Sequence, residues 1–265
     1  MGWFSIKENI LVECKMSDKE DSIPEGVVTI SKDAFMMCVN MESITFPSTL
    51  KSIQESAFRL SGLKYVYIPA NVIEIGNGAF SDCLHLKTID VSKENPIYKS
   101  VKGNLYSKSG KIILQYAAGK TEDHFIIPKT VANIGARSFS GSSFLKTVEF
   151  PPDIVGIGAW AFSGCDKLDI ETLPSTINVI HENAFRACDN ITSIKLPKGL
   201  VILDDQAFFG CKNLISVFVP ESVTTIGWMA FGFCPKLKHI ILPRKFKKSI
   251  KKIVDESDNI EVTYY

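Results

Sequence analysis

Two neighbouring stretches of equal length decide the fold of this chain: PSTINVIHENAFRACDNITSIKL at residues 174–196 and PKGLVILDDQAFFGCKNLISVFV at residues 197–219. Each begins with proline, carries an aliphatic residue three and six positions later, and places a phenylalanine eleven residues after the proline. A unit of 23 residues cannot bury its own apolar side, whereas stacked units can share one elongated core. The pattern therefore predicts a solenoid of stacked coils.

The same unit recurs along most of the 265 residues. Eight prolines each precede a phenylalanine by eleven residues, and these phenylalanines are Phe35, Phe58, Phe80, Phe139, Phe162, Phe185, Phe208 and Phe231. Successive phenylalanines are 22 or 23 residues apart, except for one step of 59, which is a repeat of 23 plus an insertion of 36. We predict eight coils in one continuous solenoid domain, with repeats over residues 23–91 and 127–243 and a hairpin insertion over residues 92–126.

Each coil has three predicted parts. Short segments such as SITFP, TVEFP and SIKLP alternate apolar and polar residues, so they predict strands that pair in parallel about 4.8 Å apart and end at the proline. Glycine recurs seven residues after a proline at Gly76, Gly135, Gly158 and Gly227, which predicts a left-handed turn. The Ala-Phe segment is predicted to form one helical turn with the phenylalanine pointing inward.

The repeat pattern I-P-x2-V-x2-I-x-x-x-A-F-x-x-C-x2-L-x2-I-x-L-P resembles the BspA-type leucine-rich repeats over residues 23–243. The resemblance implies an α/β solenoid, a right-handed superhelix with short parallel strands that is mostly β and irregular. It also implies a surface or secreted protein that binds proteins of the host matrix or of other cells.

Segments at both ends are predicted to cap the solenoid, because an open end exposes core and unpaired strand edges. In the N-terminal cap, residues 1–22, FSIKENILVECK reads as strand, turn and strand. In the C-terminal cap, residues 244–265, four apolar residues fall on one helix face: Phe246, Ile250, Ile253 and Val254. That basic helix either covers the last coil or contacts an anionic membrane or acidic partner.

The insertion contains NPIYKSVKGNLYSKSGKIILQYAAGK at residues 95–120, with turn signals at Ser109-Gly110 and Ala118-Gly119. We predict one β-hairpin or two that replace part of a coil. A structural variant of the repeat and a ligand-binding flap are both compatible with this segment. A remote alternative is an enzyme that uses the stretch from Tyr98 to Tyr116 as a lid.

Six of the seven cysteines lie three residues after a repeat phenylalanine: Cys38, Cys83, Cys165, Cys188, Cys211 and Cys234. Serine takes this slot at Ser61 and Ser142, so the position favours a small side chain and we predict buried free thiols. Disulfides between neighbouring rungs or a metal site are the alternatives. The four histidines occupy different repeat positions and form no catalytic set, so we expect no catalytic residue, metal or cofactor.

The net charge, the lengths of the apolar runs and the N-terminal residues indicate which partners and which cellular location to expect. The net charge of +1 gives no excess of basic residues for nucleic acid, and no run of 18 apolar residues could span a membrane. The charged residues Lys7, Glu8 and Glu13 interrupt any signal-like apolar segment. The sequence alone therefore predicts a cytoplasmic monomer, whereas the family resemblance implies the cell surface or secretion.

The residues that point away from the core on the strand before each proline form the candidate partner-binding face. We select Tyr65, Tyr67, Asp90, Glu149, Lys195, Phe218, His239 and Ile241. The unit DKLDIETLP at residues 166–174 breaks the alternation, so a local register shift is expected there. The predicted function is non-catalytic protein binding by an adhesin-like solenoid, with an intracellular leucine-rich-repeat scaffold as the alternative.

Overall fold

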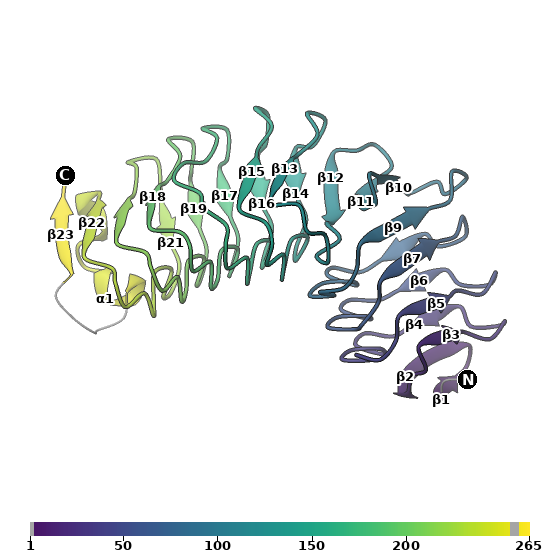
Figure 1. The fold of residues 1–265 in the computed structure, drawn as a ribbon. Helices are drawn as coiled ribbons and strands as arrows, with labels where there is room; N and C mark the ends of the chain where they lie inside the picture. The colour runs from purple at the N-terminus through teal and green to yellow at the C-terminus, as the bar shows by residue number, and fades with distance from the viewer. Residues whose placement is uncertain (1–2, 255–259) are drawn as a thin grey trace. The chain divides into compact units, whose positions relative to one another are not determined.

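The computed structural model describes residues 3–254 and 260–265. The chain divides into two compact units, residues 1–120 with 137–142 and residues 121–136 with 143–265. Both are built of short parallel strands from successive coils, with little helix (Figure 1). Within each unit the fold is therefore the predicted solenoid of parallel strands. That the two units form one continuous domain stays a prediction, and so does the right-handed superhelix. The capping roles of residues 1–22 and 244–265 also stay predictions, and both segments include residues outside the described part.

Two parallel ladders build the N-terminal unit. The ladder after each proline joins the hairpin β1–β2 to three two-residue strands: β1 (Trp3–Lys7), β2 (Ile10–Met16), β4 (Thr29–Ile30), β6 (Ser52–Ile53) and β8 (Glu74–Ile75). The ladder before each proline consists of two pairs: β3 (Glu20–Ser22) with β5 (Ser43–Thr45), and β7 (Tyr65–Ile68) with β9 (Thr88–Val91). The predicted strand–turn–strand at the N-terminus is confirmed.

The insertion is a three-stranded antiparallel meander in the same unit. Its strands are β10 (Tyr98–Val101), β11 (Asn104–Ser107) and β12 (Ile112–Gln115). The predicted turn at Ser109-Gly110 connects the last two strands, and Gly110 has the positive φ of 75° that such a turn requires. The prediction of one hairpin or two in this segment is confirmed.

The C-terminal unit repeats the same two ladders. The ladder after the proline contains β14 (Asn133–Ile134), β16 (Gly156–Ile157), β17 (Val179–Ile180), β19 (Ile202–Leu203) and β21 (Thr225–Ile226). The ladder before the proline contains β13 (His124–Ile126), β15 (Thr147–Glu149), β18 (Ser193–Lys195), β20 (Ser216–Phe218), β22 (His239–Leu242) and β23 (Glu261–Tyr264). The last strand, β23, was not predicted.

The repeat phenylalanines form the centre of the core. All eight are buried, and neighbouring rings stack, with centroids 5.3 Å apart for Phe162 and Phe185 and 5.0 Å apart for Phe185 and Phe208. The predicted helical turn around them is wrong. The Phe185 N–H donates 2.7 Å to Ala207 O in the next coil, so this backbone pairs between coils instead of within a helix.

The predicted left-handed glycine turn is also wrong, since Gly76, Gly158 and Gly227 are not among the residues with positive φ. A Cβ added at Gly158 would lie 2.7 Å from Ala136 N, and one at Gly227 would collide with the backbone of Asp205. In these coils glycine occupies the slot because the backbone of the neighbouring coil approaches closely, whereas coils with His181 and Asp204 accommodate a side chain there.

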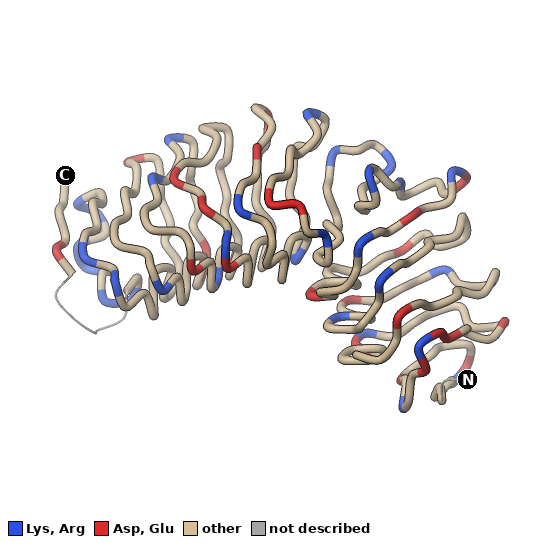
Figure 2. Tube along the Cα trace, in the orientation of Figure 1, with Lys and Arg blue, Asp and Glu red and all other residues tan. Residues whose placement is uncertain are grey.

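The prediction of one continuous helix over residues 246–254 is wrong, because the helix in this segment is shorter. The structure has a 3-10 turn η1 (Arg244–Phe246) and a four-residue helix α1 (Ile250–Ile253). Carbonyls of this segment accept hydrogen bonds from the preceding coil. Met229 N–H donates to Lys252 O, and Phe231 N–H donates to Ile253 O. Phe246 and Ile253 are buried as predicted, while Lys251 and Lys252 of α1 are exposed. Figure 2 marks the basic residues along the chain in blue.

Candidate functional site

The ladder before each proline presents outward side chains in two rows, which we call the strand face. Alternation along each strand buries one set of residues and exposes the other. In β7 the pattern is exposed, buried, exposed, buried, and in β22 it is the same. The predicted outward orientation of the candidate residues is therefore confirmed, and their role in binding stays a prediction.

The first candidate group lies in the N-terminal unit. Tyr65 and Tyr67 are 43% and 46% exposed, and they pair in register with Thr88 and Asp90 of β9. Partial burial, followed by the charge of nearby Asp90, raises the pKa of Tyr65. Two tyrosine rings beside a carboxylate form an amphipathic contact surface of the kind that interfaces favour.

Glu149 lies in the C-terminal unit among polar partners. His124 Nε2 lies 3.0 Å from Glu149 Oε1, and His124 Nδ1 lies 2.7 Å from Thr147 Oγ1. This histidine bridges two positions of β15 from the adjacent rung β13. The group is exposed and polar, and it has no aromatic anchor.

The third group, which we call the aromatic cluster, lies at β18, β20, β22 and β23. Lys195, Phe218 and Ile241 are direct cross-strand neighbours, and Lys195 Nζ lies 5.7 Å from the Phe218 ring centroid. The Phe218 ring stacks at 5.9 Å on Tyr265, whose hydroxyl donates to Val219 O at 2.8 Å. The cluster thus holds two aromatic rings and a cation in fixed positions.

His239 extends this cluster with a polar edge. It pairs in register with Ser216 and Glu261, and its Nδ1 lies 3.1 Å from Glu261 Oε2. Sequence reasoning missed Glu261 and Tyr265, because it assigned their segment to a cap without a strand. The alternation E-V-T-Y, which matches the preceding strand, is the signal that could have found them.

An irregular rung lies between Glu149 and the aromatic cluster. Residues 166–174 form no regular strand, and Thr172 makes only an isolated bridge to Lys195. Ile170 is buried and Glu171 is exposed, the reverse of the regular alternation. The predicted register shift is wrong, because Thr172 pairs with Lys195 at the regular offset of 23 residues and only the burial of Ile170 and Glu171 is reversed. This irregular rung separates Glu149 from the cluster.

The cysteine slot serves the core. All seven cysteines are free thiols, and Cys83, Cys165, Cys188 and Cys211 are buried. Cys188 Sγ donates to Phe162 O at 3.1 Å and Cys211 Sγ donates to Phe185 O at 3.2 Å, so the thiols tie adjacent coils together. Burial raises the pKa of Cys188 well above its ordinary value, which keeps the thiol protonated.

The tyrosines of the insertion also pack inward. The Tyr98 hydroxyl accepts a hydrogen bond from Ile75 N–H at 2.8 Å, and the Tyr116 ring stacks at 5.2 Å on Phe139. Tyr106 is buried, which raises its pKa to about 12. These side chains are part of the core, so the segment is built as a variant repeat.

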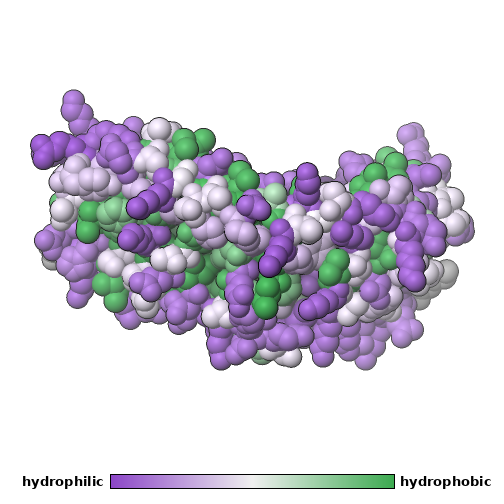
Figure 3. All heavy atoms as spheres, turned by 90° about the horizontal axis from the view of Figure 1, so that it is seen from above, coloured by the Kyte–Doolittle hydropathy of each residue, from purple (hydrophilic) through white to green (hydrophobic). Residues whose placement is uncertain are grey.

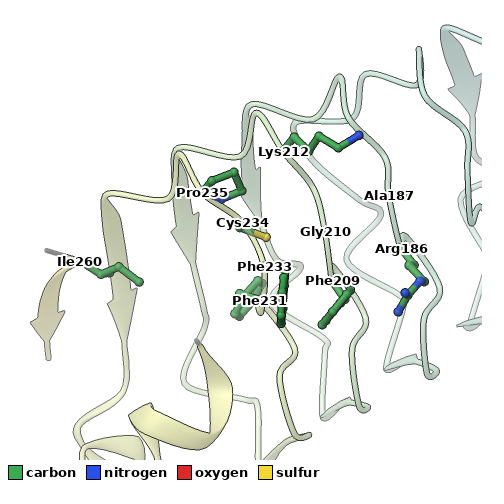
Figure 4. A pocket seen from close by; sticks show the side chains of 10 residues that line it. All are labelled: Arg186, Ala187, Phe209, Gly210, Lys212, Phe231, Phe233, Cys234, Pro235 and Ile260. Carbon is green, nitrogen blue, oxygen red and sulfur yellow. The ribbon is translucent and has the colours of Figure 1, made fainter. Parts of the chain in front are cut away.

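A hollow that sequence reasoning missed lies on the turns of the C-terminal unit (Figure 4). It measures about 580 Å³ and is lined by residues of three successive turns together with Ile260. The rings of Phe209, Phe231 and Phe233 line it, with Arg186 at its edge. No motif marks this site in the sequence, because it arises from side chains of different sizes at one repeat position.

Other surface features are less concentrated. On the face seen in Figure 3, apolar side chains form several patches between polar and charged ones. Among residues 3–254 and 260–265, no helix is long and apolar enough to cross a bilayer. In the same part of the chain, no group of three or more His, Cys, Asp or Glu side chains could hold a metal ion.

Three solved structures are similar to this chain. A leucine-rich cell surface protein from Faecalibacterium prausnitzii has a TM-score of 0.77 and 32% identity, covering 91% of this chain and 63% of that one. The pneumococcal vaccine antigen PcpA has a TM-score of 0.62 and 26% identity, covering 84% of this chain and 50% of that one. A leucine-rich repeat protein from Eubacterium ventriosum, with a TM-score of 0.52, 21% identity and 82% coverage of both chains, shows the fold alone.

The chain spans 63% and 50% of the first two of these proteins. No curated protein matches it. The sequence profile of the BspA type leucine-rich repeat region matches residues 4–113, 111–238 and 179–261 in six copies. The chain therefore belongs to the BspA-type leucine-rich repeat family, as the repeat pattern predicts.

Proposed function

We propose that this chain is a non-catalytic protein-binding module of the adhesin type, which holds a protein of the host matrix or of another cell on its strand face. The observation that carries the proposal is the aromatic cluster of Lys195, Phe218, Ile241 and Tyr265. Aromatic side chains are enriched at protein–protein interfaces, and tyrosine is among the residues most enriched among binding hot spots.

The strand face suits this role because strands on one ladder hold their side chains in a fixed order. Phe218 and Ile241 are in register, and the ring of Tyr265, which follows strand β23 two rungs away, stacks on the ring of Phe218. A surface that is already ordered loses little conformational entropy when a partner binds. The similarity to a cell surface protein supports the same setting for this chain. The module acts as a monomer, and its terminal segments cap a right-handed solenoid.

The test is surface plasmon resonance of the intact chain on immobilised fibronectin, laminin and collagen. The expected result is binding to at least one of these proteins that the combined changes Lys195→Glu, Phe218→Ala and Ile241→Ala weaken by about a hundredfold. The matched control changes Val201→Ala and Ile202→Ala, which lie exposed on the other ladder.

The control variant should bind like the parent protein. Equal affinity of the parent and the strand-face variant for a bound matrix protein would reject this site. Binding to none of the three proteins would reject the matrix class of partner.

A further inference from the structure

The hollow on the turns of the C-terminal unit is a second candidate binding site, separate from the strand face (Figure 4). We propose that it takes an acidic peptide segment of a partner protein, with a large apolar side chain packed against the phenylalanine rings and a neighbouring carboxylate on Arg186. The proposal goes beyond the strand-face function and does not depend on it.

The hollow exists because one repeat position changes size along the stack. The position two residues after the inward phenylalanine holds Gly164, Ala187 and Gly210 in three successive coils and then Phe233. The small residues leave space above the turns, and the Phe233 ring closes one side of that space. The resulting volume of about 580 Å³ is within the usual range for ligand sites.

Phe233 has a left-handed backbone conformation at this repeat position. Its φ is 54°, in the left-handed region that Gly164 and Gly210 occupy with φ of 69° and 72°. A bulky residue in this region is strained, and the Phe233 side chain is also 59% exposed to water. Met37 and Leu60 have φ of 62° and 59° at the same repeat position, so a large residue there is not unique to Phe233. What sets Phe233 apart is that its aromatic ring lines the hollow.

Phe209 gives the hollow a second aromatic wall. Its ring lies 4.9 Å from the Phe233 ring, with the two planes tilted by 35°. The buried Phe231 ring forms part of the lining beneath them. An apolar side chain placed against these rings would be removed from water on several sides, which is the main source of affinity in such sites.

Arg186 supplies the charge. Its guanidinium carbon lies 4.4 Å from the Phe209 ring centroid and 5.6 Å from the Trp160 ring centroid, so it is held flat between two aromatic groups. Its polar contacts are the neutral amides of Asn183 and Gln206, at 3.3 and 3.5 Å. Among residues 3–254 and 260–265 Arg186 forms no ion pair with a carboxylate, and the proposal places the carboxylate of the ligand there.

Lys212, the other basic residue at the hollow, already forms an ion pair. Its Nζ lies 2.7 Å from Asp189 Oδ2, and this carboxylate raises the pKa of the lysine. Because Lys212 is already paired, we assign the recognition of a carboxylate to Arg186 alone. A guanidinium with ordered planar geometry binds carboxylates in a bidentate manner.

The experiment measures fluorescence anisotropy of the intact chain with a fluorescein-labelled peptide of sequence GSEEFEESG. Two further peptides, GSKKFKKSG and GSEEAEESG, change the charge or remove the ring. We expect the first peptide to bind with a Kd below about 1 mM and each of the other two to bind at least about tenfold more weakly.

Two variants test the assigned residues. Arg186→Gln and Phe233→Gly should each weaken binding of GSEEFEESG by at least about tenfold. Phe233→Gly should keep the melting temperature within about 4 °C of the parent, because glycine suits the left-handed backbone. The control is Phe144→Gly, which removes a 42% exposed ring that does not line the hollow and should leave the affinity unchanged.

Three outcomes would overturn the proposal. Equal binding of the acidic and the basic peptide would exclude carboxylate recognition by Arg186. Absence of binding to all three peptides at about 1 mM would exclude peptide binding at this site. Binding of a neutral oligosaccharide such as cellohexaose instead, with loss of that binding in Phe233→Gly, would assign the aromatic rings to a carbohydrate.

The strand-face variant tests whether the two sites are separate. If it loses binding to the matrix protein and keeps binding to GSEEFEESG, the hollow and the strand face are distinct sites.

Discussion

The position three residues after each inward phenylalanine holds a thiol or a hydroxyl in every coil. The structure explains this choice by the hydrogen bond that Cys83 Sγ donates to Phe58 O at 3.0 Å and Cys188 Sγ to Phe162 O at 3.1 Å. The residue must be small and must tolerate burial, and the thiols at this slot also donate to a carbonyl of the preceding coil, whereas Ser142 Oγ is buried without a hydrogen-bond partner in the described part of the chain. A thiolate would lose both the donor and the favourable burial.

This slot predicts a loss of stability at high pH. Burial raises the pKa of Cys83 from 9.0 to about 11, so the folded state keeps a proton that the unfolded state releases. The stabilisation is complete below about pH 9 and is lost as the pH rises toward about 11, by up to about 1.4 kcal/mol per pH unit for one thiol. Urea unfolding at about pH 8 and about pH 10 measures it.

The control for that experiment is Cys83→Ser, which places at this slot the residue type that Ser61 and Ser142 carry in other coils. Its hydroxyl does not titrate in this range, so the variant should lose less stability between the two pH values than the parent. Equal losses in parent and variant would show that the Cys83 thiol does not contribute.

Residue by residue, the sequence predicted orientation well and local geometry less well. The outward positions of Tyr67 and Ile241 follow from alternation alone. The hollow could not be found this way, because the change from Ala187 and Gly210 to Phe233 has meaning only once the turns are known to lie side by side. The unpaired state of Arg186 likewise depends on contacts between coils.

Among the elements, the strands before each proline were predictable and the turns were not. A strand such as β20 (Ser216–Phe218) has its own period of two, which the sequence displays directly. The Ala-Phe segment has the spacing of a helical turn, yet alternate N–H groups bond to the next coil, as Phe185 does to Ala207, while those between them bond three residues back, as Arg186 does to Asn183. Local sequence cannot reveal that choice, because both arrangements satisfy the same backbone groups.

Two glycines with different surroundings, Gly227 directly after β21 and Gly210 in a turn, should lose different amounts of stability when replaced by alanine. Gly227→Ala should destabilise the chain by about 3 kcal/mol, because the new Cβ would collide with the backbone of Asp205. Gly210→Ala should cost only about 1 kcal/mol, since its φ is 72° but nothing lies within 4 Å of the new Cβ. Urea unfolding of both variants measures the difference.

The opposite ranking would contradict this explanation of the glycine slot. Equal stability of Gly227→Ala and the parent would show that the coil relaxes as coils with His181 or Asp204 at the same slot do. A large cost at both positions would show that the backbone conformation at Gly210 is as demanding as the close approach at Gly227.

At the scale of the whole molecule, each coil contacts mainly the coil before it and the coil after it. In the C-terminal unit the pairing runs from β14 through β16, β17 and β19 to β21, one rung at a time. Stability in such a stack is a sum over neighbouring coils. A defect in one coil should therefore weaken its neighbours and fade with distance along the stack.

Phe185→Ala tests this at the middle of the stack. The change removes a buried ring that stacks on Phe162 at 5.3 Å and on Phe208 at 5.0 Å, and should cost about 3–5 kcal/mol. Amide hydrogen exchange should accelerate in β16, β17 and β19, and least in β22. Phe144→Ala, at an exposed ring in the same unit, should change stability by less than about 0.5 kcal/mol. Uniform acceleration throughout residues 143–254 would mean instead that the unit opens as one cooperative block, because local openings would then require the same free energy everywhere.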